Sequence, residues 1–207
     1  MPLHHWISPQ YLNFKTISIL KTKFQNAKPF PHLELKNFFN ENKANKIKKA
    51  LQTKSFEFKQ ADLFQFSQTK DLIGTKNKVL QDFRSFLVSN EFISFMETIT
   101  NSKLKQNSID VAGTLYNDTN FLLCHDDQLE GRQIAYFLYL STMKNKDGGK
   151  LQLYDSTKNK PTQIQTTITP TFNTFAFFQV SSQSFHSVEE VTSTTPRLAI
   201  SGWFHHD

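Results

Sequence analysis

A short stretch of the sequence combines residue types that bind divalent metals. His125 and Asp127 stand two positions apart, at the end of the apolar run formed by residues 121–124. Because alternate side chains of an extended chain point the same way, both can reach one ion from a single strand end. His186 lies in a second apolar and aromatic run, residues 175–188, and is the expected third ligand. Two histidines and one carboxylate leave other coordination positions open, which is typical of non-haem Fe(II) oxygenase centres.

An arginine follows the late histidine and begins another apolar run. Alternation places Arg197, Ala199, Ser201 and Trp203 on one face, where the small residues leave room for a ligand. A guanidinium group can bind both oxygens of a carboxylate and keeps its charge when buried. A metal triad followed by Arg197 therefore indicates a cosubstrate that chelates iron at one end and carries a carboxylate at the other. 2-Oxoglutarate has that shape.

Several neighbouring residues have a structural interpretation instead. A lone histidine in a phenylalanine-rich strand is usually a hydrogen-bonded core residue, so His186 depends on its partners for its assignment. Cys124 alternates away from His125 and is interpreted as a small buried hydrophobe. Asp126 alternates to the opposite face and is expected in the turn. Residues 205–207 repeat the His-x-Asp spacing, but they follow the last predicted strand and are interpreted as a frayed end.

Composition indicates one packed, intracellular domain. The chain has 207 residues with 21 phenylalanines, enough for a substantial core. The net charge is +6, and the lysines scattered through residues 43–78 are interpreted as solvated surface, although weak attraction to nucleic acid is physically reasonable. The single cysteine excludes an intramolecular disulfide and fits a reducing compartment. We find no secretory signal and no apolar run of the ~18 residues that span a membrane, and therefore expect a cytoplasmic location.

The pattern divides the chain into an extension and a domain. Residues 1–28 are weakly patterned, and prolines at positions 29 and 31 mark the entry to a single domain, 29–207. Residues 36–105 are expected to give helical support and residues 108–205 a core of strands. Helical spacing predicts helices over 40–53, 78–89 and 91–98, and alternation predicts short extended segments at 33–35, 56–58 and 63–66.

From about residue 109 the hydrophobic period changes to two. Turn signals, including Gly148-Gly149, separate eight predicted strands, at residues 111–116, 121–124, 133–140, 150–154, 163–168, 174–180, 184–188 and 197–204. Eight antiparallel strands at this spacing predict a mainly β (α+β) protein built on a cupin-like jelly roll, or double-stranded β-helix, with an open mouth that suits a metal site.

Ordered motifs carry a family resemblance over residues 29–205. They are Pro29-Phe30-Pro31-His32, Asp62-Leu63-Phe64-Gln65-Phe66, Leu122-Leu123-Cys124-His125-Asp126-Asp127, Leu129-Glu130-Gly131-Arg132, Leu138-Tyr139-Leu140, Ser184-Phe185-His186, Arg197 and Ile200-Ser201-Gly202-Trp203-Phe204-His205. The sequence resembles the 2-oxoglutarate/Fe(II)-dependent prolyl hydroxylases, most closely the branch that hydroxylates a small-subunit ribosomal protein (prolyl 3-hydroxylase-like). The resemblance implies these site residues: iron ligands His125, Asp127 and His186; 2-oxoglutarate contacts Arg197, Tyr116 and Tyr139; and the substrate-facing Arg132.

The resemblance also implies a reaction and its partners. Oxidative decarboxylation of 2-oxoglutarate to succinate and CO2, with O2 as cosubstrate and ascorbate as reductant, would be coupled to hydroxylation of a prolyl ring carbon. The expected partner is a protein that carries a target proline, with a ribosomal protein as the first candidate. We expect this chain to have neither a specific nucleic-acid site nor a membrane interaction. Alternatives are the same chemistry on another protein or a small molecule, a non-catalytic jelly-roll binding module, and a zinc hydrolase, which gives Arg197 no role.

Overall fold

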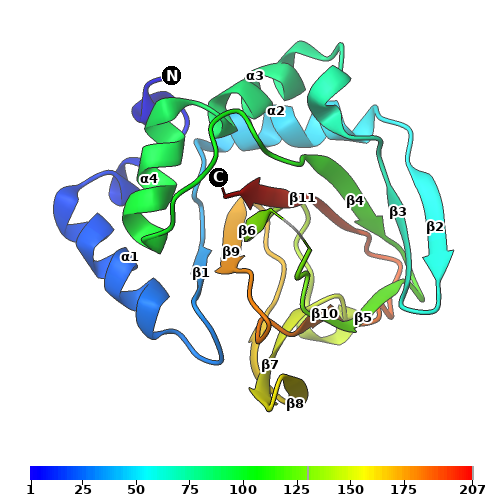
Figure 1. Ribbon diagram of the computed structural model, residues 1–207. Helices are drawn as coiled ribbons and strands as arrows, with labels where there is room; N and C mark the ends of the chain where they lie inside the picture. The colour runs from blue at the N-terminus through cyan, green and yellow to red at the C-terminus, as the bar shows by residue number, and fades with distance from the viewer. Residues whose placement is uncertain (130, 207) are drawn as a thin grey trace.

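The computed structural model describes residues 1–129 and 131–206. Within them, eleven strands form one antiparallel sheet that curls round on itself, and four α-helices cover one outer side of it (Figure 1). The strands are β1 His32–Leu35, β2 Glu57–Ala61, β3 Phe64–Gln68, β4 Ala112–Tyr116, β5 Phe121–His125, β6 Arg132–Tyr139, β7 Leu151–Thr157, β8 Lys160–Ile168, β9 Thr174–Gln179, β10 His186–Val188 and β11 Arg197–His205.

The strand order creates two facing walls. The order is β1-β9-β6-β11-β4-β3-β5-β10-β7-β8, with β2 paired to β3 alone. Strand β3 makes the corner, because its residues Ser67 and Gln68 pair with β4 while Phe64 and Gln65 pair with β5. One wall therefore holds β1, β9, β6, β11 and β4, and the other holds β5, β10, β7 and β8. This is the double-sheet jelly roll that the sequence predicted.

The helices pack against the first wall. They are α1 Phe14–Asn26, α2 Glu41–Gln52, α3 Lys78–Leu87 and α4 Asn90–Thr100, and each begins at a polar residue whose side chain accepts a backbone N–H of the first turn. Strand β9 shows how the layers meet. Its Phe175 and Phe177 lie in the helix-side core, whereas Ala176 and Phe178 belong to the cluster inside the roll. The same alternation in β11 leaves Arg197 facing inward.

The predicted fold class is confirmed, and all eight predicted strands of the roll are present, as are the three predicted helices. The sequence pattern did not predict α1, which buries Leu20 and Phe24 in the helix-side core. Its signal is weak because two of its other large apolar residues, Phe14 and Ile19, are exposed. None of the helices in the described ranges combines the length and the apolar character needed to cross a membrane.

Candidate metal and cosubstrate site

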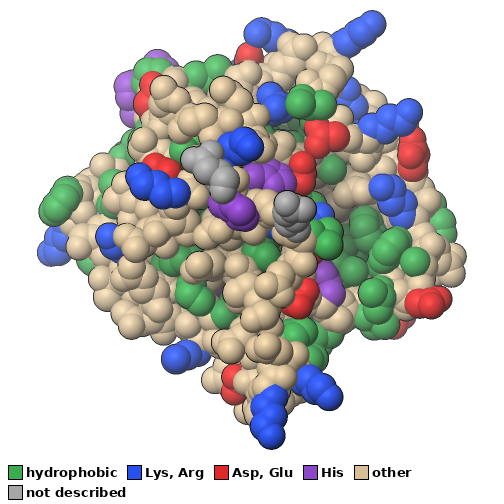
Figure 2. Space-filling model, viewed as in Figure 1, with side chains coloured by type: hydrophobic (Ala, Val, Ile, Leu, Met, Phe, Trp, Pro, Cys, Tyr) green, Lys and Arg blue, Asp and Glu red, His purple; other side chains and the backbone are tan. Residues whose placement is uncertain are grey.

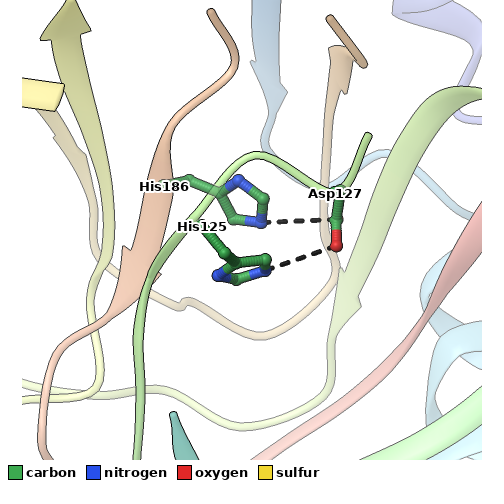
Figure 3. Close-up of side chains that lie close together, drawn as sticks. All are labelled: His125, Asp127 and His186. Carbon is green, nitrogen blue, oxygen red and sulfur yellow. Dashed lines mark ion pairs between the residues drawn. The ribbon is translucent and has the colours of Figure 1, made fainter. Parts of the chain in front are cut away.

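Two histidines from neighbouring strands form the floor of the site. His125 is the last residue of β5 and His186 the first of β10, and the two are directly paired in the sheet. Their ring centroids lie 4.1 Å apart, and both rings turn toward Asp127 (Figure 3). His186 is almost fully buried and also lies 4.6 Å, centroid to centroid, from the ring of Phe178. Sheet pairing therefore brings together two side chains that are far apart in the sequence.

Asp127 completes the cluster from a turn. Its Oδ1 lies 3.3 Å from Nε2 of His125, and its Oδ2 lies 3.4 Å from Nε2 of His186. Strand β5 ends at His125, and Asp127 adopts a left-handed backbone conformation with φ of 60°. A turn, rather than the extended alternation we expected, thus delivers this carboxylate. For a residue other than glycine such a conformation costs of order 1–3 kcal/mol, and strain of this kind gathers at functional sites.

Backbone carbonyls fix the orientation of both imidazole rings. Nδ1 of His125 lies 2.8 Å from the carbonyl oxygen of Leu123, and Nδ1 of His186 lies 2.8 Å from that of Ser184. Because a carbonyl oxygen can only accept, we infer that Nδ1 carries a proton in each ring. Nε2 then faces Asp127 and is the nitrogen available to a metal.

The charges in this cluster favour an anionic carboxylate. Burial opposes ionisation of Asp127, but hydrogen bonds from His125 and His186 and their positive charge hold its pKa well below the usual range. Burial lowers the pKa of His125, and the hydrogen bond and charge of Asp127 outweigh this, so that the net pKa is raised. A metal ion would displace protons from these nitrogens and take their place beside the carboxylate.

The three ligand atoms lie within 4.8 Å of one another, and in the described part of the chain no other group of three or more His, Cys, Asp or Glu side chains meets that geometry. Two imidazole nitrogens and one carboxylate oxygen are a donor set that suits Fe(II), with positions left for other ligands.

A second cluster surrounds the guanidinium group of Arg197. This side chain is 1% exposed, and its Nε donates a hydrogen bond of 2.8 Å to the carbonyl oxygen of Gly149. The rings of Tyr116 and Tyr139 flank it, with centroids 5.0 and 5.1 Å from its Cζ. Nη2 of Arg197 and Oη of Tyr139 are buried without a hydrogen-bond partner in the described residues. Buried polar atoms of this kind are rare and costly, so both are suited to a ligand carboxylate.

Both tyrosines stay protonated, so their hydroxyl groups can donate hydrogen bonds to an acceptor on a ligand. Burial raises the pKa of Tyr139 to about 12, although the positive charge of Arg197 opposes the rise. Burial likewise raises the pKa of Tyr116. Neutral phenol groups donate hydrogen bonds, so Arg197 and its neighbours offer donors to an anion. These groups fit the distal carboxylate of 2-oxoglutarate.

One cavity joins the two clusters. It has a volume of about 190 Å³, which is small beside the roughly 300–1,000 Å³ of pockets for drug-sized ligands. The triad, Arg197 and Tyr116 line it together with apolar walls, which include Phe64, Phe66, Leu122, Phe137 and Trp203. Figure 2 shows apolar side chains gathered on the right of this face of the molecule, over β3 and β5.

Arg132 lies beside the metal cluster. Its Nη1 is 3.3 Å from Oδ1 of Asp127, its Cζ lies 3.5 Å from the ring centroid of Trp203, and its side chain is 19% exposed. It is thus held by Asp127 and Trp203 in this structure, and its contact with a substrate stays a prediction.

Sequence patterns missed two supports of the site. Gly149 was interpreted as a turn residue alone, and the indole of Trp203 was placed on the correct face without a role.

Cys124, Asp126 and His205, which were given structural interpretations, lie outside the metal cluster. Cys124 is half-buried, and burial raises the pKa of its thiol to about 11. Asp126 supports the turn by accepting the backbone N–H of Gln128. His205 is the last residue of β11, with its Nε2 3.3 Å from Oδ2 of Asp110, so our expectation that it lies beyond the last strand was wrong. Position 207 lies outside the described residues.

Comparison with known proteins identifies the class. Residues 111–205 match the sequence model described as the 2OG-Fe(II) oxygenase superfamily. The matched segment is 95 of the 207 residues, and over it the chain is similar to this superfamily, whose name gives iron and 2-oxoglutarate as its reactive partners. The two histidines, the aspartate and Arg197 all lie within the matched segment.

Particular relatives are prolyl hydroxylases. The chain is 40% identical over 181 residues to the prolyl 3-hydroxylase OGFOD1 of Xenopus laevis, covering 86% of this chain and 35% of the relative. It is 33% identical over 198 residues to the prolyl 3,4-dihydroxylase OGFOD1 of Ostreococcus tauri, covering 87% and 38%. It thus spans about a third of their length. The solved prolyl-4-hydroxylase of Pseudomonas putida superposes with a TM-score of 0.74 over 92% of this chain and 99% of that one, at 13% identity, which shows the shared fold.

Proposed function

We propose that this chain is an Fe(II)- and 2-oxoglutarate-dependent dioxygenase that hydroxylates a prolyl residue of a protein. One observation carries the chemistry: a single cavity is bordered by the His-Asp-His cluster and by Arg197, whose Nη2 is buried without a partner in the described residues. A zinc hydrolase would leave Arg197 unexplained. A cosubstrate that chelates the metal at one end and carries a carboxylate at the other would use both the His-Asp-His cluster and Arg197.

Each residue has a distinct part in this proposal. His125, Asp127 and His186 hold the iron through Nε2 atoms and a carboxylate oxygen. Arg197 and Tyr139 donate hydrogen bonds to the distal carboxylate of 2-oxoglutarate, with Tyr116 beside them. When bound, iron and 2-oxoglutarate supply the oxidising power that adds one oxygen atom of O2 to a C–H bond, with ascorbate as the reductant that maintains ferrous iron.

Apolar walls around the site serve the same chemistry. Phe64, Phe137 and Trp203 line the cavity together with the metal cluster. They limit the access of water to the reacting atoms, which suppresses side reactions, and they suit the largely apolar ring of proline.

The protein substrate is proposed from the relatives. Both relatives named above are prolyl hydroxylases. A small-subunit ribosomal protein is our first candidate for the substrate of this chain. In this proposal the guanidinium N–H groups of Arg132 donate hydrogen bonds to a peptide carbonyl of the substrate at the edge of the site. The single domain over 29–207 and a cytoplasmic location belong to the same proposal, the latter being compatible with the single, unpaired cysteine.

The test combines cosubstrate turnover with peptide mass spectrometry. The protein is incubated with Fe(II), 2-oxoglutarate, O2 and ascorbate, and with peptides from ribosomal proteins, peptides from other proteins, or free proline. We expect succinate formation stimulated by prolyl peptides, and a mass gain of one oxygen atom on a proline. His186→Ala should abolish both, whereas the matched control His205→Ala should keep them. Stimulation by free proline alone would replace the protein substrate by a small molecule, and an absence of succinate would leave a binding module.

A further inference from the structure

Asp127 needs support from outside its own turn. It lies beyond the end of β5, its backbone is in the left-handed region, and its side chain is 8% exposed. A metal-binding carboxylate must keep one orientation, because a small rotation moves the ligand oxygen away from the two histidines. The groups that hold its oxygens therefore decide how well the three ligands are organised before a metal arrives.

Trp203 and Arg132 hold one carboxylate oxygen each. The indole Nε1 of Trp203 donates a hydrogen bond of 2.9 Å to Oδ2 of Asp127, while Nη1 of Arg132 lies 3.3 Å from Oδ1. The guanidinium of Arg132 in turn stacks on the Trp203 ring, with Cζ 3.5 Å from the centroid. The three side chains form a closed arrangement in which the tryptophan contacts both other members.

The backbone of Trp203 is fixed much more firmly than that of Asp127. It lies within β11, is paired with Ala135 of β6, and accepts a hydrogen bond of 3.0 Å from the backbone N–H of Asp110. The neighbouring Gly202 permits this close approach, because a Cβ there would lie 1.8 Å from the carbonyl oxygen of Asp110. A rigid strand thus presents the indole N–H to a carboxylate carried by a turn.

We propose that Trp203 is a positioning residue for the metal centre, which acts through its indole N–H on Asp127 and orients that carboxylate for metal binding. No chemical step is assigned to Trp203 itself. The proposal depends on the metal cluster and is independent of the substrate, so it stands even if the hydroxylated molecule is not a protein. Loss of such an outer hydrogen bond typically weakens metal affinity about 10- to 100-fold.

The test measures Ni(II) binding by calorimetry in the full chain. Ni(II) suits imidazole ligands, so weakened variants should keep a measurable affinity. Trp203→Phe keeps an aromatic ring beneath Arg132 and removes the N–H donor together with the second ring of the indole. The matched control is Trp6→Phe, because Trp6 stacks on Phe86 in the helix-side core and lies outside the cavity. We expect Trp203→Phe to raise the Ni(II) dissociation constant about 10- to 100-fold and Trp6→Phe to leave it within about twofold.

A second background separates positioning from general packing. In Asp127→Ala the two histidines remain as ligands, and the indole has lost its acceptor. Adding Trp203→Phe to Asp127→Ala should then change Ni(II) affinity by less than about twofold, because the proposed effect passes through the carboxylate. An equal loss of affinity in both backgrounds would overturn the proposal in favour of a packing role, and an unchanged affinity in Trp203→Phe alone would also overturn it.

Discussion

Replacing Arg197 by lysine keeps the positive charge and removes the planar group that the structure holds in place. Lysine cannot reproduce both the hydrogen bond from Nε to Gly149 and a second donor, now unpaired at Nη2, aimed at a ligand. A hydrogen bond to a charged partner contributes about 1.5–3 kcal/mol. Losing one such bond to the distal carboxylate should raise the KM for 2-oxoglutarate about 10- to 100-fold, since each 1.4 kcal/mol is about tenfold.

The assay for Arg197→Lys is succinate formation over a range of 2-oxoglutarate concentrations, together with calorimetric Ni(II) binding. Metal affinity should stay near the wild-type value, because Arg197 contacts none of the three ligand side chains. Arg84→Lys is the matched control, since Arg84 lies in α3 outside the cavity, and its KM should not change. An unchanged KM in Arg197→Lys, or an equal rise in Arg84→Lys, would refute the role of Arg197.

Three further changes follow from the same contacts. Tyr139→Phe removes a buried hydroxyl that has no hydrogen-bond partner in the described residues, so the ligand-free protein should keep or gain thermal stability. The KM for 2-oxoglutarate should rise about 2- to 10-fold, because a donor to its distal carboxylate is lost. A lowered Tm with an unchanged KM would contradict this prediction. At Gly148, where φ is 69°, an alanine Cβ would lie 1.9 Å from the carbonyl oxygen of Glu190, so Gly148→Ala should lower the Tm by several degrees. Gly74→Ala, with open space around the added Cβ, should leave the Tm nearly unchanged. Phe24→Ala should cost about 3–5 kcal/mol in chemical denaturation, and Phe14→Ala, 89% exposed, should cost almost nothing; equal effects would contradict the assigned packing.

Local sequence patterns were sufficient for the strands of the roll, and they singled out the metal-ligand candidates and Arg197, whose roles stay predictions. Period-two alternation identified the strands, and the same alternation in β11 placed Arg197 and Trp203 on the inward face, as observed. His125 and His186 carried no local signal of their proximity. Their direct pairing follows from the β5–β10 register, which only the complete sheet determines.

Other features depend on tertiary context that no local pattern reports. Helix α1 exposes Phe14 and Ile19, which masks its apolar stripe. Asp127 reaches the cluster through a left-handed turn, and the residue type gives little warning of this because only a few per cent of non-glycine residues adopt a positive φ, even though aspartate is enriched among them. The role of Gly149 in holding Arg197 is a backbone carbonyl contact, and any residue type supplies a carbonyl.

The central claim is that one cavity binds the metal at the His-Asp-His cluster and the distal carboxylate of 2-oxoglutarate at Arg197. A crystal structure of the protein with Mn(II) and 2-oxoglutarate tests it most directly. We predict that Nε2 of His125, Nε2 of His186 and a carboxylate oxygen of Asp127 all coordinate the same ion directly. Nη2 of Arg197 and Oη of Tyr139 should both donate to the distal carboxylate. An ion bound elsewhere, or a 2-oxoglutarate whose distal carboxylate leaves Arg197 unpaired, would contradict the account.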